Sequence, residues 1–305
     1  MTQGQYDEFA LLAENAAEAG VSGPLPNCMR VSCTLADKTS LSAIKWGDDP
    51  QIVFLHGGGQ NAHTWDTVVV ALGISALAID LPGHGHSDWR ADHDYWPVRN
   101  AEAAAHAIRI HAPNSAGVVG MSLGGLTTIR LAAAHPELVR RAVVIDVTPS
   151  VFERQTSMTR EQRGTTALIS GPRVYDTAED MIAATAASAP HRSVSSIRRG
   201  VLHNAKALVD GKWTWRYDDL DPEGTGSPDF SALWRDVSAA IPPIALVVGG
   251  NSVFVADADR DEFRRRRPEA VITTIPAAGH SVQSDQPVAL ARFLRSFIFA
   301  DELLE

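Results

Sequence analysis

Cysteine is scarce in this sequence, with only Cys28 and Cys33 among 305 residues. Two cysteines so close together cannot build the disulfide framework of a small secreted protein, and they cannot supply the four ligands of a structural zinc site. A chain that does not use disulfides fits a reducing compartment. We therefore expect a cytoplasmic location.

Basic residues are also in the minority, since 27 Lys and Arg stand against 36 Asp and Glu and give a net charge of −9. A nucleic-acid binder needs a basic face, so this partner class is not expected. Residues 1–20 contain no Lys or Arg, unlike the start of a signal peptide. No apolar run reaches the ~18 residues of a membrane span. We therefore expect a small-molecule substrate as the partner, and neither nucleic acid nor a membrane. The composition does not predict an oligomeric state.

Short apolar runs alternate with helical stretches along much of the chain, which is typical of parallel βαβ units. Because these runs are continuously apolar, we expect strands that are buried on both faces of a sheet. Two further strands at 29–35 and 40–46 suggest an antiparallel edge. The apolar runs before the interruption described next lie at 52–55, 74–79, 116–120 and 142–147.

This alternation is lost over residues 149–240 and returns with strands at 244–248 and 271–275. The interrupting segment contains several helical patches and a Pro- and Gly-rich run at 221–228 that is typical of turns. The pattern predicts one sheet-based core made of residues 1–148 and 241–305. An insertion of residues 149–240 interrupts it.

The strongest chemical signal is the motif Gly-Met-Ser-Leu-Gly at 120–124, between a predicted buried strand and a predicted helix. A serine at such a sharp turn takes a strained backbone conformation, and glycines on either side avoid collisions. The turn presents the hydroxyl at a helix N-terminus, where the dipole favours developing negative charge. The motif indicates Ser122 as a nucleophile. An ordinary glycine-rich turn is the alternative.

A second glycine-rich turn, His-Gly-Gly-Gly at 56–59, follows the strand at 52–55. Its backbone N–H groups can approach a substrate oxygen and form an oxyanion hole with the N–H of Leu123. Gly58 is our choice for the second donor, and Gly59 is its competitor. The phosphate-binding pattern G-x-x-x-x-G-K-[ST] is absent and G-x-G-x-x-G does not follow this strand. We expect no cofactor and no metal.

His280 lies in the loop after the strand at 271–275. Histidine suits the role of general base because its ordinary pKa lies near neutrality. Residues that follow parallel strands meet at the carboxyl edge of the sheet, so His280 can reach Ser122. A surface loop histidine is the alternative interpretation.

Taken in this order, the motifs resemble the α/β-hydrolase fold family, from about residue 29 onwards. The resemblance implies a mostly parallel eight-stranded sheet flanked by helices, with a helical cap inserted after the sixth strand, where residues 149–240 fall. It also implies a Ser–acid–His triad and an oxyanion hole. By the same resemblance, the turn at 80–87 has a structural role and is not expected to supply metal ligands. The matching segments are residues 56–58, 80–87, 120–125 and 279–280.

The acid of the triad is open, because the family most often places it in the turn after the seventh strand, where this sequence has Ser252. Some members of this fold carry the acid at the end of the sixth strand, which here is Asp146, our choice. Asp257 is the alternative acid, followed by Asp259, although both also suit the N-terminus of a helix. The acid would hold the histidine tautomer and stabilise the imidazolium.

These residues predict a hydrolase of a small or medium-sized carboxylic ester or lactone. Ser122 would form an acyl-enzyme, His280 would transfer the proton, and Asp146 would orient His280. Two alternatives stay open. A C–C bond hydrolase of a diketone-type substrate would use the same residues, and a cofactor-independent oxygenase would use the His–Asp pair to abstract a proton.

Overall fold

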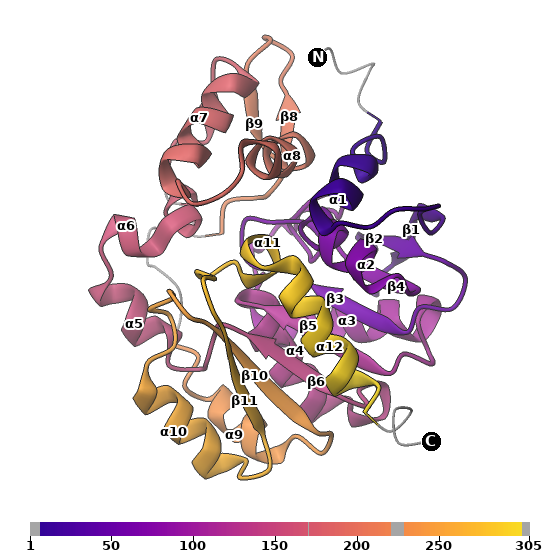
Figure 1. Cartoon of the computed structure of the whole chain (residues 1–305), viewed down its shortest axis with the longest axis vertical. Coiled ribbons are helices and arrows are strands. Elements are labelled where there is room, and N and C mark those ends of the chain that lie inside the picture. Colours follow the sequence, from indigo (N-terminus) through magenta and orange to yellow (C-terminus); the bar gives the residue numbers. More distant parts are fainter. Residues whose placement is uncertain (1–6, 170, 221–228, 301–305) are drawn as a thin grey trace.

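The computed structural model describes residues 7–169, 171–220 and 229–300. Within these residues, eight strands form one sheet in the order β1-β2-β4-β3-β5-β6-β10-β11 (Figure 1). β2 pairs antiparallel with β1 and with β4, and every other pair is parallel, so the predicted fold class is confirmed. The strands are β1 Cys28–Thr34, β2 Ser40–Trp46, β3 Ile52–Leu55, β4 Ala76–Ile79, β5 Gly117–Met121, β6 Ala142–Ile145, β10 Ile244–Gly249 and β11 Val271–Ile275.

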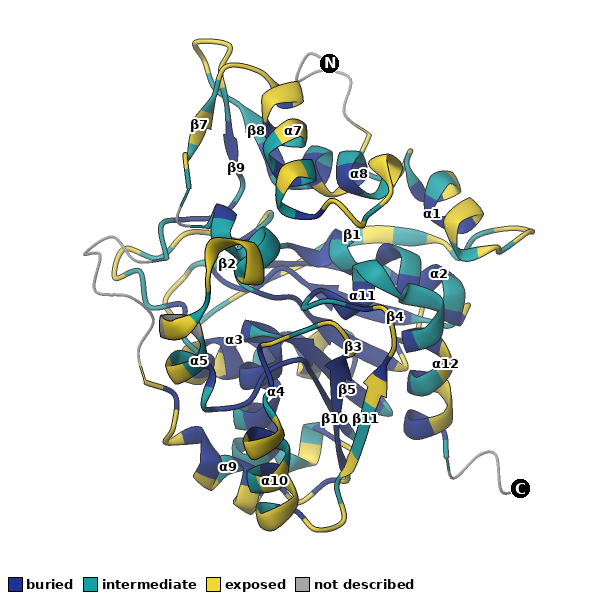
Figure 2. Cartoon of the chain, turned by 60° about the vertical axis from the view of Figure 1, so that its left-hand side comes forward, coloured by how far each residue is buried: buried dark blue, intermediate teal, exposed yellow. Residues whose placement is uncertain are grey.

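Helices cover both faces of this sheet, as continuously apolar strands require. Along β3, Val53 and Leu55 join the core under one helical layer, whereas Ile52 and Phe54 join the core under the other. All four side chains are fully buried (Figure 2). One layer holds α3 (Pro97–His111), α4 (Leu123–Ala134), α9 (Leu233–Ala239) and α10 (Asp257–Arg266), and the other holds α1 (Leu12–Ala19), α2 (Asp66–Leu72) and α12 (Pro287–Ile298).

Most of the segment between β6 and β10 leaves the large sheet and forms a separate lobe beside its carboxyl edge (Figure 1). Its last helix, α9, instead packs in a helical layer of the core. The lobe contains a small antiparallel sheet in the order β7-β9-β8, in addition to the expected helices. The predicted turn at 221–228 lies outside the described residues. The elements are α5 Val151–Ser157, α6 Arg160–Arg163, η4 Gly164–Leu168, β7 Val174–Tyr175, α7 Ala178–Ser188, α8 Val194–Asn204, β8 Ala205–Ala207 and β9 Trp213–Trp215.

Two helices differ from what the apolar spacing of the sequence predicts. The spacing predicts a helix over 4–19, whereas α1 begins at Leu12 and is followed by Gly20, which adopts the left-handed conformation. The spacing also predicts a helix near 64–72, which is split into a 3-10 turn, η2 (Ala62–Trp65), and α2. The side chain of Asn61 accepts a hydrogen bond from the N–H of His63 and so starts this turn earlier than expected.

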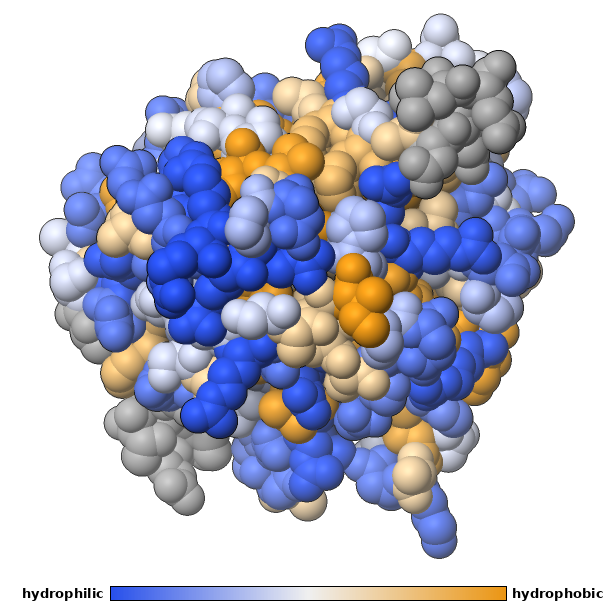
Figure 3. Space-filling model, turned by 90° about the horizontal axis from the view of Figure 1, so that it is seen from below, coloured by the Kyte–Doolittle hydropathy of each residue, from blue (hydrophilic) through white to orange (hydrophobic). Residues whose placement is uncertain are grey.

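The surface carries no extended apolar face on the side that Figure 3 shows, where hydrophilic side chains predominate and hydrophobic ones form small patches. Among the described residues, no helix combines the length and the apolar character that a membrane crossing requires.

Candidate active site

Ser122 occupies the sharp turn between β5 and α4, at φ +52° and ψ −118°. This conformation is rare for a residue with a side chain, and it points to a position that the surrounding structure enforces. The backbones on either side are in close contact. A Cβ atom on Gly120 would lie 2.0 Å from the carbonyl oxygen of Gly124, and one on Gly124 would lie 2.2 Å from that of Leu55. A side chain at either position would collide with the backbone, so both residues must be glycine.

His280 lies in the loop after β11, and its Nδ1 is 2.8 Å from Oδ2 of Asp146. Asp146 ends β6 at φ +52° and its side chain is fully buried. The ring of Phe254 stacks on the imidazole, with centroids 3.5 Å apart and planes inclined by 13°. Nε2 of His280 is buried and has no hydrogen-bond partner among the described residues. Since Nδ1 is occupied by Asp146, Nε2 is the ring nitrogen that could accept a proton from Ser122. A hydrogen bond between the two need not be present in the free enzyme, because catalytic hydrogen bonds often form only with substrate.

Three donors satisfy the carboxylate of Asp146. Oδ1 accepts a hydrogen bond from the N–H of Gly249 at 2.9 Å. Oδ2 accepts one from Oγ of Ser252 at 2.5 Å as well as the contact from His280. A buried carboxylate needs such partners, since an unpaired one would be costly.

The alternative acids lie elsewhere. The side chain of Asp257 is 97% exposed at the start of α10, and Arg260 lies 3.9 Å away. Asp259 is buried, but it accepts hydrogen bonds from Arg154 and from the N–H of Ala256. The structure therefore brings Asp146, and neither of the other two, into contact with His280.

The glycine loop after β3 offers one free donor. Gly57 N–H donates to Oε1 of Gln60 at 3.1 Å, and Gly59 N–H donates to Nε2 of His84 at 3.1 Å. Within the described part of the chain, no hydrogen bond uses the N–H of Gly58 or of Leu123. The competitor Gly59 is already occupied, and the two N–H groups chosen from the sequence are the ones available to a substrate oxygen.

Two buried histidines hold this loop as neutral rings. Nδ1 of His56 contacts the carbonyl oxygen of Gly57, and its Nε2 accepts from the N–H of Leu81. His84 repeats the pattern between Pro82 and Gly59. Burial lowers the pKa of His56, and burial together with the nearby His56 lowers the pKa of His84 to about 3. The turn at 80–87 therefore supports the glycine loop.

A cavity of about 140 Å³ joins these groups, and Gly58, Ser122 and His280 line it. The insertion supplies another part of the wall, including Ile169 and Tyr217. The sequence contained no signal for this wall, because its residues belong to no motif.

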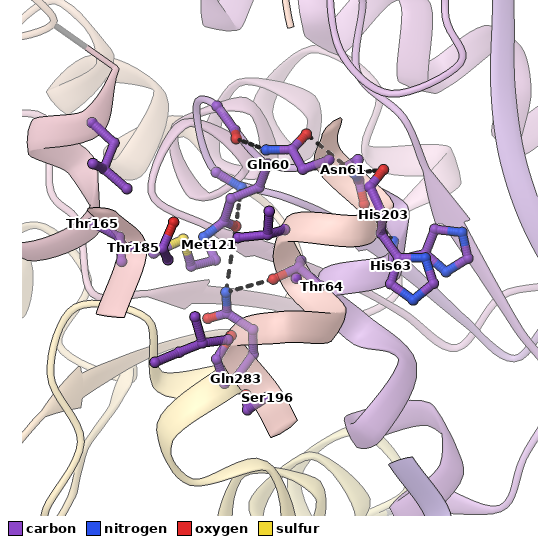
Figure 4. A pocket seen from close by; sticks show the side chains of 18 of the residues that line it. Gln60, Asn61, His63, Thr64, Met121, Thr165, Thr185, Ser196, His203 and Gln283 are labelled. Atoms are coloured by element: carbon purple, nitrogen blue, oxygen red, sulfur yellow. Dashed lines mark hydrogen bonds between the residues drawn. The ribbon is translucent and has the colours of Figure 1, made fainter. Parts of the chain in front are cut away.

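A glutamine pair was also missed by the sequence reasoning. Nε2 of Gln283 donates to Oγ1 of Thr64 at 3.2 Å and to Oε1 of Gln60 at 3.4 Å (Figure 4). Because Gln60 also accepts from Gly57, the pair links the helix after His280 to the glycine loop. Gln283 follows His280 closely in the sequence, and that spacing is the only signal that could have found it.

One group of potential metal ligands occurs within the described residues, namely His63, Asp66 and His203. Nδ1 of His63 is 2.9 Å from Oδ2 of Asp66, and its Nε2 is 3.2 Å from Oε2 of Glu8. Although burial lowers the pKa of His63, these two carboxylates overcome it and raise the pKa to about 9.

The rings of His63 and His203 stack with centroids 3.8 Å apart and planes inclined by 9° (Figure 4). Imidazole binds a metal in the plane of its ring. Two nearly parallel planes share no such point, so we interpret the group as an ion-pair network. It joins α8 of the insertion to the core.

Comparisons with known proteins bear on the fold and on the class of activity. A model of the Alpha/beta hydrolase family matches residues 52–293. The chain is 53% identical over 294 residues to the esterase Rv0045c of Mycobacterium tuberculosis, covering 96% of each chain. A solved structure of that esterase has a TM-score of 0.85 at 52% identity and covers 95% of this chain and 98% of the other. The 2-(acetamidomethylene)succinate hydrolase of Mesorhizobium japonicum is 27% identical over 86% of this chain and 93% of its own.

Proposed function

Since the chain belongs to the alpha/beta hydrolase family and is a carboxylic ester hydrolase, we propose that Ser122, His280 and Asp146 are its catalytic triad. The observation that carries the proposal is the 2.8 Å contact between Nδ1 of His280 and Oδ2 of Asp146. It orients the ring so that Nε2 is left for Ser122. Both Ser122 and His280 line one cavity.

In the proposed reaction, Oγ of Ser122 attacks the carbonyl carbon while Nε2 of His280 accepts its proton. The carbonyl oxygen becomes negative and receives hydrogen bonds from the N–H groups of Gly58 and Leu123. His280 then gives the proton to the leaving alcohol, and an acyl-enzyme remains. A water molecule, activated by the same ring, releases the acid. Asp146 stabilises the imidazolium that forms in each half-reaction.

We propose that the lobe within residues 149–240 is a cap over the core of residues 1–148 and 241–305, which α9 joins at the end of the insertion. The support comes from two side chains of the insertion that reach the glycine loop. A Cβ atom placed on Gly58 would lie 3.7 Å from Cδ1 of Ile169, and one on Gly59 would lie 3.5 Å from Cε1 of Tyr217. These side chains would limit the group next to the scissile carbonyl. The cavity thus favours a small or medium-sized, partly apolar ester or lactone.

The acidic net charge of −9 supports a small-molecule substrate over nucleic acid. The cytoplasmic location expected from the cysteine content stays a prediction.

A fluorophosphonate probe tests the nucleophile, because it reacts with serines that a neighbouring base activates. The wild type should be labelled at one residue, and Ser122→Ala should abolish the label. Ser296→Ala removes an exposed hydroxyl of α12 and serves as the matched control, with full labelling expected. A folded wild type that takes no label would disprove the nucleophile.

A substrate panel separates the reaction classes that share these residues. Short-chain esters and lactones should be turned over, with activity lost in Ser122→Ala. Faster turnover of diketones than of esters would favour the C–C hydrolase. Oxygen consumption that persists in Ser122→Ala but disappears in His280→Ala would favour the cofactor-independent oxygenase.

A further inference from the structure

The loop that follows β10 contacts the proposed triad at three points. Gly249, the last residue of β10, leads into this loop and donates its N–H to Oδ1 of Asp146. Ser252 donates its hydroxyl to Oδ2 of the same carboxylate. The ring of Phe254 stacks on His280. One short segment therefore holds both oxygens of the acid and one face of the base.

The direction of the Ser252 hydroxyl is defined by its second contact. Oγ accepts a hydrogen bond from the N–H of Phe254 at 3.2 Å. Because a hydroxyl has one hydrogen, this contact leaves that hydrogen for Oδ2 of Asp146, 2.5 Å away. The loop backbone thus orients the serine, and the serine orients the carboxylate.

The charge balance around Asp146 explains why neutral donors occupy these places. Within the described residues, the only basic side chain paired with this carboxylate is His280 itself. A Lys or Arg at the same position would neutralise the carboxylate and weaken its attraction for the imidazolium. A hydroxyl and a backbone N–H satisfy the buried oxygens and keep the negative charge available to the histidine.

We propose that Ser252 is a positioning residue for the triad, because its hydroxyl holds Oδ2 of Asp146 against Nδ1 of His280. The proposal rests on the triad described above and extends it to the turn after β10. Position 252 and Asp146 converge on the same point beside His280. The side chain of an aspartate at position 252 would be one bond longer than that of the serine. Its carboxylate can therefore reach that point when the side chain of Asp146 is removed.

The first test compares two replacements of Ser252. Ser252→Ala should lower kcat about tenfold, since it removes a hydrogen bond to a charged group. KM should change less than about twofold, because Ser252 does not line the cavity. Ser252→Thr keeps a hydroxyl and should restore most of kcat. Asn251→Ala, which changes an exposed neighbour in the same loop, is the matched control and should keep full kcat.

The second test moves the acid. Asp146→Gly suits the positive φ of that position and should cost ~10³-fold in kcat. Adding Ser252→Asp to Asp146→Gly should recover at least about tenfold, if position 252 faces His280 as the contacts indicate. Thermal melting of each variant confirms that it is folded.

The outcomes separate this proposal from the triad itself. If Ser252→Ala keeps full kcat while Asp146→Asn is impaired, the triad stands and the positioning role is wrong. A double variant that is no more active than Asp146→Gly also overturns the positioning role. If Asp146→Asn is fully active, the proposed acid itself is wrong.

Discussion

Nε2 of His84 accepts a hydrogen bond from the N–H of Gly59 at 3.1 Å. The other ring nitrogen of His84 lies 3.0 Å from the carbonyl oxygen of Pro82. The lowered pKa of His84, about 3, keeps the ring neutral, so Nε2 remains an acceptor. This contact occupies the N–H of Gly59 and leaves free the N–H of Gly58, which is the donor that we propose for the oxyanion hole. A residue with no direct part in the reaction thus decides which N–H is available.

His84→Leu should impair both stability and catalysis. The change leaves the half-buried N–H of Gly59 without its acceptor, which costs about 1 kcal/mol of unfolding free energy. The glycine loop would lose its position, and kcat should fall about tenfold or more. Urea unfolding and ester hydrolysis measure the two effects. His86→Leu, on the same turn, is the control. An equal loss of kcat in both variants would show that the turn as a whole, rather than His84, is responsible.

Replacing the two candidate acids separately should give unequal results. Asp146→Asn keeps the shape of the side chain but removes its charge beside His280, so kcat should fall by ~10³-fold or more. Asp257→Asn changes an exposed side chain and should alter kcat less than about twofold. Steady-state kinetics on one ester compares them directly. The reverse order of effects would reassign the acid to Asp257.

His63 should make the protein lose stability in alkaline solution. Its pKa of about 9 exceeds the ordinary value of 6.5, so the folded state holds this proton more tightly than the unfolded chain. The resulting stabilisation is complete below pH 6.5 and is lost as pH rises through 9. Urea unfolding between pH 6 and 9.5 should show this loss in the wild type and a smaller one in His63→Gln.

His111→Gln is the control for this pH series, because burial lowers the pKa of His111, so its titration adds no loss of stability as the solution becomes alkaline. This variant should follow the slope of the wild type. If His63→Gln follows that slope as well, the ion pairs of His63 do not stabilise the folded state.

Two glycine-to-alanine changes should have opposite signs. In Gly120→Ala the new methyl group would meet the backbone of Gly124 at 2.0 Å, so we expect destabilisation of at least about 2 kcal/mol and loss of activity. In Gly200→Ala nothing lies within 4 Å of the new group inside α8, and helix propensity should add about 0.5–1 kcal/mol. Denaturant titrations of both variants decide the signs. A stable Gly120→Ala enzyme would contradict the packing of the turn.

The local patterns that the structure confirms share one physical origin. The apolar runs at 52–55 and 244–248 are buried strands, because consecutive apolar residues make both faces of a strand apolar and helices cover both faces of this sheet. The glycines at 120 and 124 marked a backbone contact too close for any side chain. Such constraints act within a few residues, so they are visible in the sequence.

Contacts between distant segments were not visible in this way. His63 and His203 are stacked although 140 positions separate them, and neither carries a signal for the other. The small sheet of the insertion depends on the pairing of β9 with both β7 and β8, three short strands with weak patterns of their own. Ser252 looked like a missing acid, and only the folded chain shows its contact with Asp146.

The sequence by itself determined the order of strands and helices in the core, the turn that bears Ser122 and the class of chemistry, because each depends on neighbouring residues. The tertiary structure decided which acid contacts His280 and which N–H of the glycine loop is left free. Both choices depend on contacts between loops at the carboxyl edge of the sheet, Asp146 with Ser252 and the N–H of Gly59 with His84. The sequence ranked Asp146 before Asp257 and Gly58 before Gly59, and only the fold supplies the partners that distinguish them.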